Sequence, residues 1–332
     1  MGSSFATPDV ASCLATAPLA PGIDRPGAGL TGAGRSVSMT VVRVTAVEIP
    51  TRVLVFGMAR PDGTIDGPEL YDVAEACGHT DEQLRSCLRR LVAEGLLDRE
   101  GSGRQATFRT TPSGDQLRAG SMRRHEMAYR QDQKGQGWDG HWHLVAFAIP
   151  EHKRAARDRL RDRLLDEGGA PVNNGMYVSA HPWEDTVRRI ADHLDVADRL
   201  TLASTQDLEV GGVRAARELA RALWPVDEIG AAYSRFVREH SDVVPTLERL
   251  RARHDRIADS DFLPGALRMV IAFQEVFLRD PLLPPELLPR PWPGRAAREL
   301  LLTSRRLALR LRAEHERPAL FAAFDQFADQ AP

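Results

Sequence analysis

Cysteine is scarce in this 332-residue chain, and so are long apolar runs. The three cysteines, Cys13, Cys77 and Cys87, show no CxxC spacing, so the sequence indicates neither a disulfide framework nor a zinc ribbon. No apolar run approaches the length of about 18 residues that a membrane-spanning helix needs. We therefore expect a protein of a reducing cytoplasm with no membrane partner.

Catalytic motifs and a dominant charge are also lacking. The sequence contains no GxSxG, Walker loop, HExxH or GxGxxG motif, and we interpret Glu184, Asp280 and Glu286 as scattered carboxylates without a partner at acid/base spacing. We expect no catalysis, no cofactor and no bound metal. The net charge of -2 gives no global case for nucleic acid, so a DNA-binding surface would require a local concentration of basic residues.

The chain does contain enough apolar sequence for more than one folded core. Hydrophobic residues make up 42% and charged residues 27%, which is typical of soluble globular proteins, and at roughly 100 to 200 residues per domain the length suggests two or three domains. Breaks rich in Gly, Gln or Pro separate a tail at 1–38 from blocks at 39–124, 125–208 and 209–332.

The tail is rich in Gly, Ala, Pro and Ser and lacks the basic start and the apolar stretch of a signal peptide. It is therefore predicted to be disordered. The ordered pattern begins at Met39, so part of the tail could come from a misassigned start codon.

The first block predicts three helices and a hairpin. Residues 51–60 and 68–77 favour short helices, and a third begins at Thr80, where Gln83 completes a capping box. Its apolar stripe consists of Leu84, Leu88, Leu91 and Val92, and Gly95 ends it. Two strands follow at 96–100 and 105–110 around a Gly-Ser-Gly turn. Helix, turn, helix and hairpin together predict a winged helix-turn-helix.

Basic residues concentrate in this block, with nine arginines against four acidic residues between Arg85 and Arg124. A recognition helix presents such side chains to base edges, and a wing presents them to phosphate or the minor groove. An isolated arginine pair would favour a solvated helix face, but the combination of cap, stripe, turn and wing favours DNA. The expected DNA-binding residues are Thr80, Gln83, Arg85, Ser86, Arg89, Arg90 and, in the wing, Arg104.

The second block predicts the order β-α-β-β-α-β, which is ferredoxin-like. Strands are expected at 142–149, on either side of Asn174 within 170–180, and at 199–208, with helices at 151–167 and 184–194. His141 and His143 could share a face and hold a metal or the carboxylate of a ligand. Alternatively, they could cap strand-end polar groups beside a packed Trp138 and Trp142, and we favour this second interpretation.

The third block predicts helices from about residue 211, apart from an extended, proline-rich connection at 280–294. The predicted fold class of the whole chain is therefore α+β.

Three segments carry a resemblance to a known family. They are Gly140 to Glu151 (GHWHLVAFAIPE), Gly175 to Ser179 (GMYVS) and Asp280 to Gly294 (DPLLPPELLPRPWPG). With them the chain resembles the PaaX-type repressors of phenylacetic acid degradation over nearly everything after residue 39. The resemblance implies a winged helix, a central domain similar to the Cas2 nucleases, and a helical C-terminal domain.

The resemblance also implies a homodimer on double-stranded operator DNA, released when a small effector such as an aryl-acyl-CoA binds. A two-fold dimer would place its recognition helices roughly 34 Å apart on a palindrome. The identity of the effector does not transfer from the family. We expect its pocket between the second and third blocks, where aromatic walls could combine with a cation; the residues are Trp138, Trp142, Tyr233, Arg268 and Trp292. The alternative is that these aromatic residues are interdomain packing.

Other functions remain open at this stage. Cas2 nucleases place a catalytic Asp at the end of their first strand, where this chain has Ala148, so a metal-dependent nuclease is disfavoured. A ligand-independent DNA-binding protein would not need the 200-residue extension after the winged helix. An activator and a repressor cannot be distinguished by sequence, and only the resemblance favours a repressor.

Overall fold

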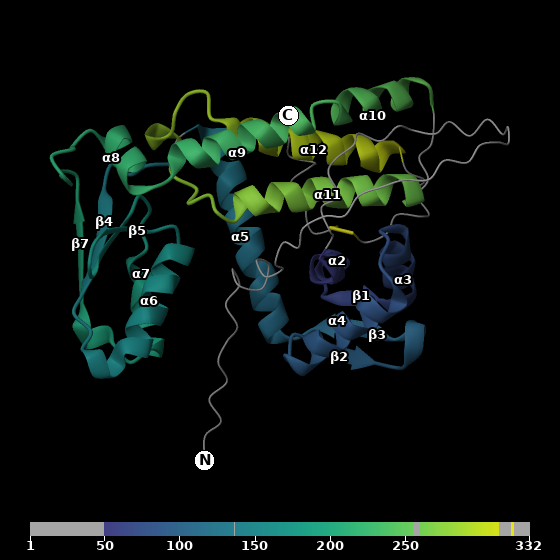
Figure 1. Ribbon diagram of the computed structural model, residues 1–332, viewed down its shortest axis with the longest axis horizontal. Helices are drawn as coiled ribbons and strands as arrows, with labels where there is room; N and C mark the ends of the chain where they lie inside the picture. Colours follow the sequence, from purple (N-terminus) through teal and green to yellow (C-terminus); the bar gives the residue numbers. More distant parts are fainter. Residues whose placement is uncertain (1–49, 136, 255–258, 312–319, 322–332) are drawn as a thin grey trace, which may run out of the picture.

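The computed structural model describes residues 50–135, 137–254, 259–311 and 320–321. A layer of helices, α9, α11 and α12, runs along the long axis, with a small N-terminal unit below one end and a four-stranded sheet at the other (Figure 1). The expected disordered tail at 1–38, with Cys13 and Met39, lies outside the described residues. No helix among the residues described is long and apolar enough to cross a membrane.

The N-terminal unit combines helices with a small antiparallel sheet of order β1-β3-β2. Its elements are α2 (Thr51–Gly57), β1 (Thr64–Asp66), α3 (Gly67–Ala76), α4 (Asp81–Ala93), β2 (Leu97–Glu100), the 3-10 turn η1 (Gly103–Gln105) and β3 (Thr107–Thr110). The three helices and the hairpin are as expected, except that α2 ends before residue 60. Strand β1 was not predicted, because three residues are too few to show a period of two.

Helix α4 begins as its sequence predicts. The Thr80 hydroxyl accepts a hydrogen bond from the Gln83 backbone N–H, and the Gln83 side-chain oxygen accepts one from the Thr80 N–H, at 3.2 and 2.8 Å. Leu84, Leu88 and Leu91 are buried. Gly95 has a φ of 69°, a left-handed conformation that glycine adopts without a steric penalty. Local chemistry therefore fixes both ends of the helix.

A 23-residue helix, α5 (Pro112–Lys134), links the N-terminal unit to the rest of the chain. It begins at a Thr111 cap with Pro112 in its first turn and ends at Gly135 in the left-handed conformation. The boundary expected between 124 and 125 falls inside this helix. The sequence does not predict this helix, because Gly114 and Gly120 interrupt a largely polar stretch that shows little apolar periodicity.

The central sheet has the order β5-β6-β4-β7 with antiparallel neighbours, which is the ferredoxin-like strand order expected from the sequence. Helices α6 and α7 cover one face, and α8 and the proline-rich segment pack on part of the other. The elements are β4 (Trp142–Phe147), η2 (Glu151–Lys153), α6 (Arg154–Asp166), β5 (Ala170–Asn173), β6 (Met176–Ser179), α7 (Glu184–His193), η3 (Ala197–Arg199) and β7 (Leu200–Thr205).

The C-terminal part is helical, as predicted, with an extended connection after α11. Its elements are α8 (Ala216–Leu223), α9 (Val226–Glu239), α10 (Val243–Ala252), α11 (Asp259–Phe277), η4 (Pro285–Leu287) and α12 (Pro293–Leu311). Residues 320–321 pack back onto the N-terminal unit. There Phe321 lies so close to α2 that a Cβ at Gly57 would come within 2.9 Å of its ring.

Candidate functional sites

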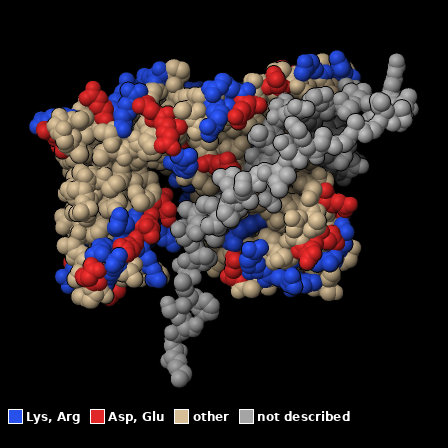
Figure 2. Space-filling model, in the orientation of Figure 1, with Lys and Arg blue, Asp and Glu red and all other residues tan. Residues whose placement is uncertain are grey.

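The seven residues expected to meet DNA are all exposed, and six of them belong to the start and outer face of α4. Arg85, Ser86, Arg89 and Arg90 lie on the face opposite the leucine stripe, because the stripe faces the core of the N-terminal unit. Basic side chains gather along the lower edge of this unit, where α4 and β2 lie (Figure 2). The geometry therefore offers a contiguous surface of guanidinium groups.

Thr80 and Gln83 have a structural role at the start of the same helix. Their oxygen atoms are used within the capping box, and Arg85 is paired with Asp81 at 2.8 Å. The first turn also carries Glu82, so its local charge is acidic. The basic character of α4 thus begins at Arg85 and continues through Arg90.

Arg104, in the turn between β2 and β3, lies against α3. Its guanidinium carbon is 4.9 Å from the centre of the Tyr71 ring, and its nitrogens are 3.5 Å from Asp72 and 3.6 Å from Asp81. The side chain is still 42% exposed. This arginine therefore neutralises carboxylates beside α4, a role that sequence reasoning missed because Asp72 is 32 positions away in the chain.

Four of the five residues expected at an effector pocket meet where the central sheet joins the helical layer. Trp142 is fully buried and stacks with Trp224, and half-buried Trp138 lies 5.4 Å from Trp142 between ring centres. Half-buried Trp292 packs edge-on against Tyr233 at 6.0 Å and touches both the cluster around Trp142 and the cluster around Tyr233. The aromatic residues thus form one continuous packed junction.

Arg268, the fifth residue, lies elsewhere. It belongs to α11, near enough to Cys77 of the N-terminal unit to act electrostatically on its thiol, although burial is the stronger effect and raises the pKa of Cys77 to about 11. The cation beside Tyr233 is Arg298 of α12, which donates to both Asp132 oxygens at 2.5 and 2.8 Å. Burial alone would lower the pKa of Arg298, but the hydrogen bonds and charge of Asp132 raise it above its ordinary value.

Asp280 is a structural centre of this junction, contrary to its interpretation as a scattered carboxylate. It is buried, accepts the Tyr233 hydroxyl at 2.9 Å and the Leu282 N–H at 2.8 Å, and its backbone oxygen accepts from Arg124 of α5. Burial, with the charge of Asp280, raises the pKa of Tyr233 far above its usual range. Tyr233 is therefore a neutral donor, and its hydrogen bond to Asp280 joins α9 to the proline-rich segment.

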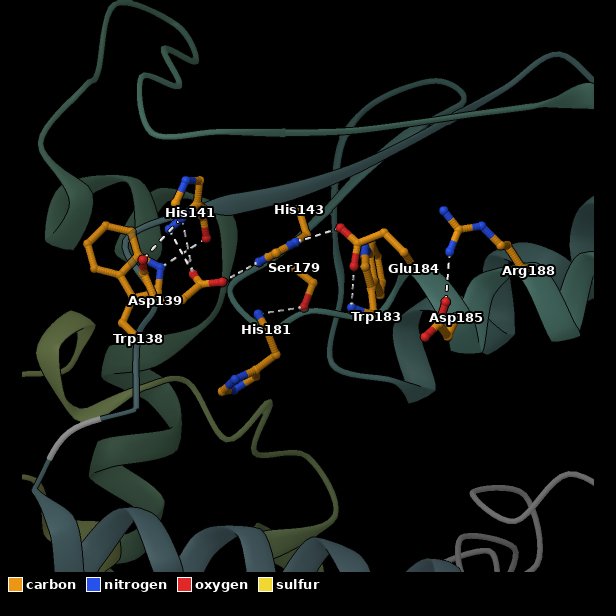
Figure 3. A network of polar contacts seen from close by, with 10 residues as sticks. All are labelled: Trp138, Asp139, His141, His143, Ser179, His181, Trp183, Glu184, Asp185 and Arg188. Atoms are coloured by element: carbon orange, nitrogen blue, oxygen red, sulfur yellow. Dashed lines mark hydrogen bonds and ion pairs between the residues drawn. The ribbon is translucent and has the colours of Figure 1, made fainter.

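Glu184 and Glu286 also have partners. Figure 3 shows His143 between two carboxylates, with Nδ1 2.6 Å from Glu184 and Nε2 3.0 Å from Asp139. Burial opposes ionisation of Glu184, but the hydrogen bond from His143 and the backbone N–H groups of Glu184 and Trp183 together lower its pKa. Glu286 accepts from the backbone N–H groups of Gly137 and Trp138. Buried His143 thus joins β4 to α7 through a pair of carboxylates, which is a different role from the strand-end cap that we favoured.

Ala148 follows β4 directly and is exposed. Its methyl group supplies no oxygen ligand at the place where a Cas2-type nuclease has its Asp, so the chemistry of this position does not fit a divalent cation. Among the residues described, no group of three or more His, Cys, Asp or Glu side chains is arranged to hold a metal ion.

Two family models match adjoining parts of the chain, and together they span more than half of it. "PaaX protein central Cas2-like domain" matches residues 135–220, and "PaaX-like protein C-terminal domain" matches residues 224–317. The chain belongs to the PaaX family. The resemblance inferred from the sequence motifs is thereby confirmed, and the match covers the sheet, the junction and the helical layer of this PaaX protein.

Two relatives extend the comparison. The chain is 27% identical over 233 residues to the transcriptional repressor PaaX of Escherichia coli strain K12, a match that covers 70% of this chain and 71% of the relative. An uncharacterized protein from Mycobacterium tuberculosis has a similar solved structure, with a TM-score of 0.51 and 23% identity over 79% of this chain and 97% of that one. At that identity the second likeness concerns the fold alone.

Proposed function

We propose that this member of the PaaX family is a cytoplasmic, sequence-specific DNA-binding regulator of transcription and not an enzyme. Its N-terminal unit acts as a winged helix-turn-helix and comprises about residues 39–124, with the continuation of α5. The Cas2-like domain follows to about residue 208, and the helical domain begins at about residue 209. The name of the E. coli relative favours a repressor.

The observation that carries the proposal is the outer face of α4. Arg85, Arg89 and Arg90 are exposed on a helix that is capped at its start and anchored by leucines, and a hairpin follows it directly. Arginine forks of this kind match guanine edges in the major groove, and α4 is the helix that would enter it. The element order helix, strand, helix, helix, strand, strand supports the same assignment.

The effector is proposed to act at the junction between sheet and helical layer. Half-buried Trp138 and Trp292 offer aromatic surface there. The cations of this junction are Arg298 and Arg124, which in this structure bind Asp132 and the Asp280 backbone oxygen. An acyl-CoA, as the family resemblance suggests, would combine an apolar acyl group with phosphates and so fit aromatic walls next to arginine. Differential affinity for the DNA-free state would then release the operator.

A fluorescence-anisotropy titration against the DNA upstream of its own gene, at fixed salt, tests the proposal. Wild-type protein should bind saturably, and an Arg85→Ala, Arg89→Ala double variant should bind specifically at least about tenfold more weakly. A panel of aryl-acyl and aliphatic acyl-CoA thioesters, added to the complex, tests the effector. If no thioester reverses binding, the proposal that the effector is an acyl-CoA is wrong. If the wild type and the double variant bind with equal affinity, the proposal that α4 contacts DNA is wrong.

A further inference from the structure

The hydrophobic core of the N-terminal unit contains a residue from the last part of the chain. Leu320 is only 7% exposed and belongs to the same core as Leu54 and Val55 of α2, and half-buried Phe321 packs against that core. In Figure 1 these two residues are the short yellow segment between α11 and α2. The pair Leu320 and Phe321, the C-terminal clasp, thus completes a core that is built mainly from the first part of the chain.

The backbone of the clasp is held from two sides. The Phe321 N–H donates to the Gly57 oxygen at 2.5 Å. On the other side, Nη2 of Arg305 in α12 donates to the backbone oxygens of both clasp residues, at 3.2 and 2.8 Å. Gly57 is the last residue of α2, where the carbonyl groups have no partner within the helix. The clasp therefore satisfies a helix end of the N-terminal unit and is itself anchored to the helical layer.

The backbone of Gly57 does not itself require glycine. The residue lies in a helix without a positive φ, and glycine favours helices less than alanine does. A Cβ at this position would lie 2.9 and 3.0 Å from two ring atoms of Phe321 and 3.2 Å from Leu320 Cδ1, and these are the three nearest atoms outside its own stretch of helix. The clasp is therefore the feature that excludes a side chain at Gly57.

Helix α2 connects the clasp to α4. Nη1 of Arg52, in the first turn of α2, donates to a carboxylate oxygen of Glu94 at the C-terminal end of α4, at 2.8 Å. Leu54 of α2 and Leu84 of α4 are fully buried in the same core. A displacement of α2 would therefore move α4 as well, because packed interiors deform little.

We propose that the C-terminal clasp locks the N-terminal unit in one orientation relative to the helical layer, and that operator binding depends on this lock. The second part of the proposal rests on the proposed function. For a homodimer on a palindromic operator, as the family resemblance implies, both α4 helices must reach their half-sites at one fixed separation. A locked unit loses less conformational freedom when it binds, so the closed clasp favours the operator and its release weakens binding to paired half-sites.

The first experiment tests the clasp without DNA, by calorimetry. Gly120 of α5 is the matched control, because a Cβ there would meet only Arg123 Nη2, at 3.8 Å. Gly120→Ala should therefore raise the thermal midpoint by roughly 1 to 3 °C. Gly57→Ala makes the same change of helix propensity but displaces the Phe321 ring, so it should lower the midpoint. In a Phe321→Ala background, where the ring is absent, Gly57→Ala should no longer lower it.

Hydrogen exchange reports the same contact in the wild-type chain, whether or not a variant folds. The Phe321 N–H donates to Gly57 beside a packed core, so it should exchange about as slowly as the amides of α2. Gly57→Ala should accelerate exchange at Phe321 at least about tenfold, and Gly120→Ala should leave it unchanged. Mass spectrometry resolved to single amides measures these rates.

The second experiment measures operator binding by fluorescence anisotropy, with the full operator and with a duplex that carries one half-site. Gly57→Ala and Phe321→Ala should each weaken binding to the full operator at least about tenfold. The same variants should change binding to the half-site less than about threefold, because each winged helix remains intact. Gly120→Ala should bind both duplexes as the wild type does.

The outcomes separate this inference from the proposed function. Rapid exchange at Phe321, or a midpoint raised by Gly57→Ala as much as by Gly120→Ala, would show that the clasp is not docked and would overturn the inference. Equal losses on both duplexes, or unchanged binding to the full operator, would show that the clasp does not control orientation. A wild type that binds no operator would overturn the proposed function and the dependence of binding on the clasp, whereas the docked clasp would still stand on the midpoints and exchange rates.

Discussion

Leu267 and Phe273 lie six residues apart on α11, and each is fully buried in a different core. Leu267 packs among residues of the N-terminal unit such as Leu70 and Leu84, whereas Phe273 packs with Tyr233 and Phe236 of the helical layer. One helix is thus shared between the unit proposed to bind DNA and the domain proposed to sense the effector. A shift of α11 in one core would change the packing in the other, because packed interiors deform little.

The shared helix predicts a joint loss of stability and binding. Leu267→Ala should lower the free energy of unfolding by about 2 to 5 kcal/mol, since it leaves a cavity in the N-terminal core. Urea denaturation measures the change, and operator affinity should fall at temperatures where the N-terminal unit begins to open. Leu165→Ala removes the same atoms at a site 46% exposed and should cost far less. Equal costs at the two sites would contradict the packing described.

The arginines of α4 and the turn should differ in how they affect binding. Arg85→Ala or Arg89→Ala should weaken specific binding by roughly 1 to 3 kcal/mol if the side chain meets a base edge. Arg104→Ala should weaken binding to all sequences similarly, because it removes a positive charge beside Asp72 and Asp81 at the proposed DNA surface. Mobility shifts with operator and scrambled duplexes measure both effects. No change in any of the three variants would mean that the DNA surface lies elsewhere.

The capping box of α4 predicts a modest stability effect. Thr80→Ala removes the acceptor for the Gln83 N–H and should cost about 1 kcal/mol. Thr80→Ser retains a hydroxyl and is the matched control, expected within a few tenths of a kcal/mol of wild type. Thermal and urea unfolding followed by circular dichroism provide the measurement, and an alanine variant as stable as the serine variant would show that the cap contributes nothing.

The buried pair of Tyr233 and Asp280 predicts coupling between α9 and the proline-rich segment. Tyr233→Phe leaves Asp280 Oδ2 without its hydroxyl donor and should cost about 1 to 3 kcal/mol. A double-mutant cycle with Asp280→Asn isolates the pair, and a coupling energy of about 0.5 kcal/mol or more is expected. Strictly additive single effects would refute a direct interaction between the two side chains.

His125 predicts a loss of stability on acidification. Burial, the largest influence, lowers its pKa from 6.5 to about 4, while the Ser121 oxygen opposes that shift and nearby arginines add to it. The neutral ring fits its neighbours, with Nδ1 2.9 Å from the Ser121 oxygen and Nε2 3.1 Å from the Gln274 amide nitrogen.

Between pH 6.5 and 4, His125 is protonated in the unfolded chain but neutral in the folded chain. Stability should therefore be intact above pH 6.5 and fall by about 3 kcal/mol as the pH is lowered to 4. Urea midpoints at several pH values measure the slope. His125→Gln removes the titrating group, so its stability should fall less over the same range, and an identical slope in the two proteins would exclude this histidine.

Much of the fold could be predicted because its signals are local. The Thr80 and Gln83 cap, the Gly95 terminus and the glycine turn before β3 each act within a few residues, and the central sheet shows its strands between recognisable turns. The seven residues of the proposed DNA surface are accordingly exposed where the sequence places them. Helix α5 and strand β1 escaped prediction because one lacks apolar periodicity and the other lacks length.

The sequence by itself determined most of the elements, the ferredoxin-like arrangement of the central sheet and the basic face of α4, since capping, period and turn chemistry depend on neighbours in the chain. Only the tertiary structure decided which partners meet across long separations. It paired Arg298 with Asp132, 166 positions away, and placed Arg268 near Cys77 and away from the aromatic junction. It also packed α11 into two cores. The sequence could not predict this, because a periodic stripe shows which face of a helix is apolar but not which core covers that face.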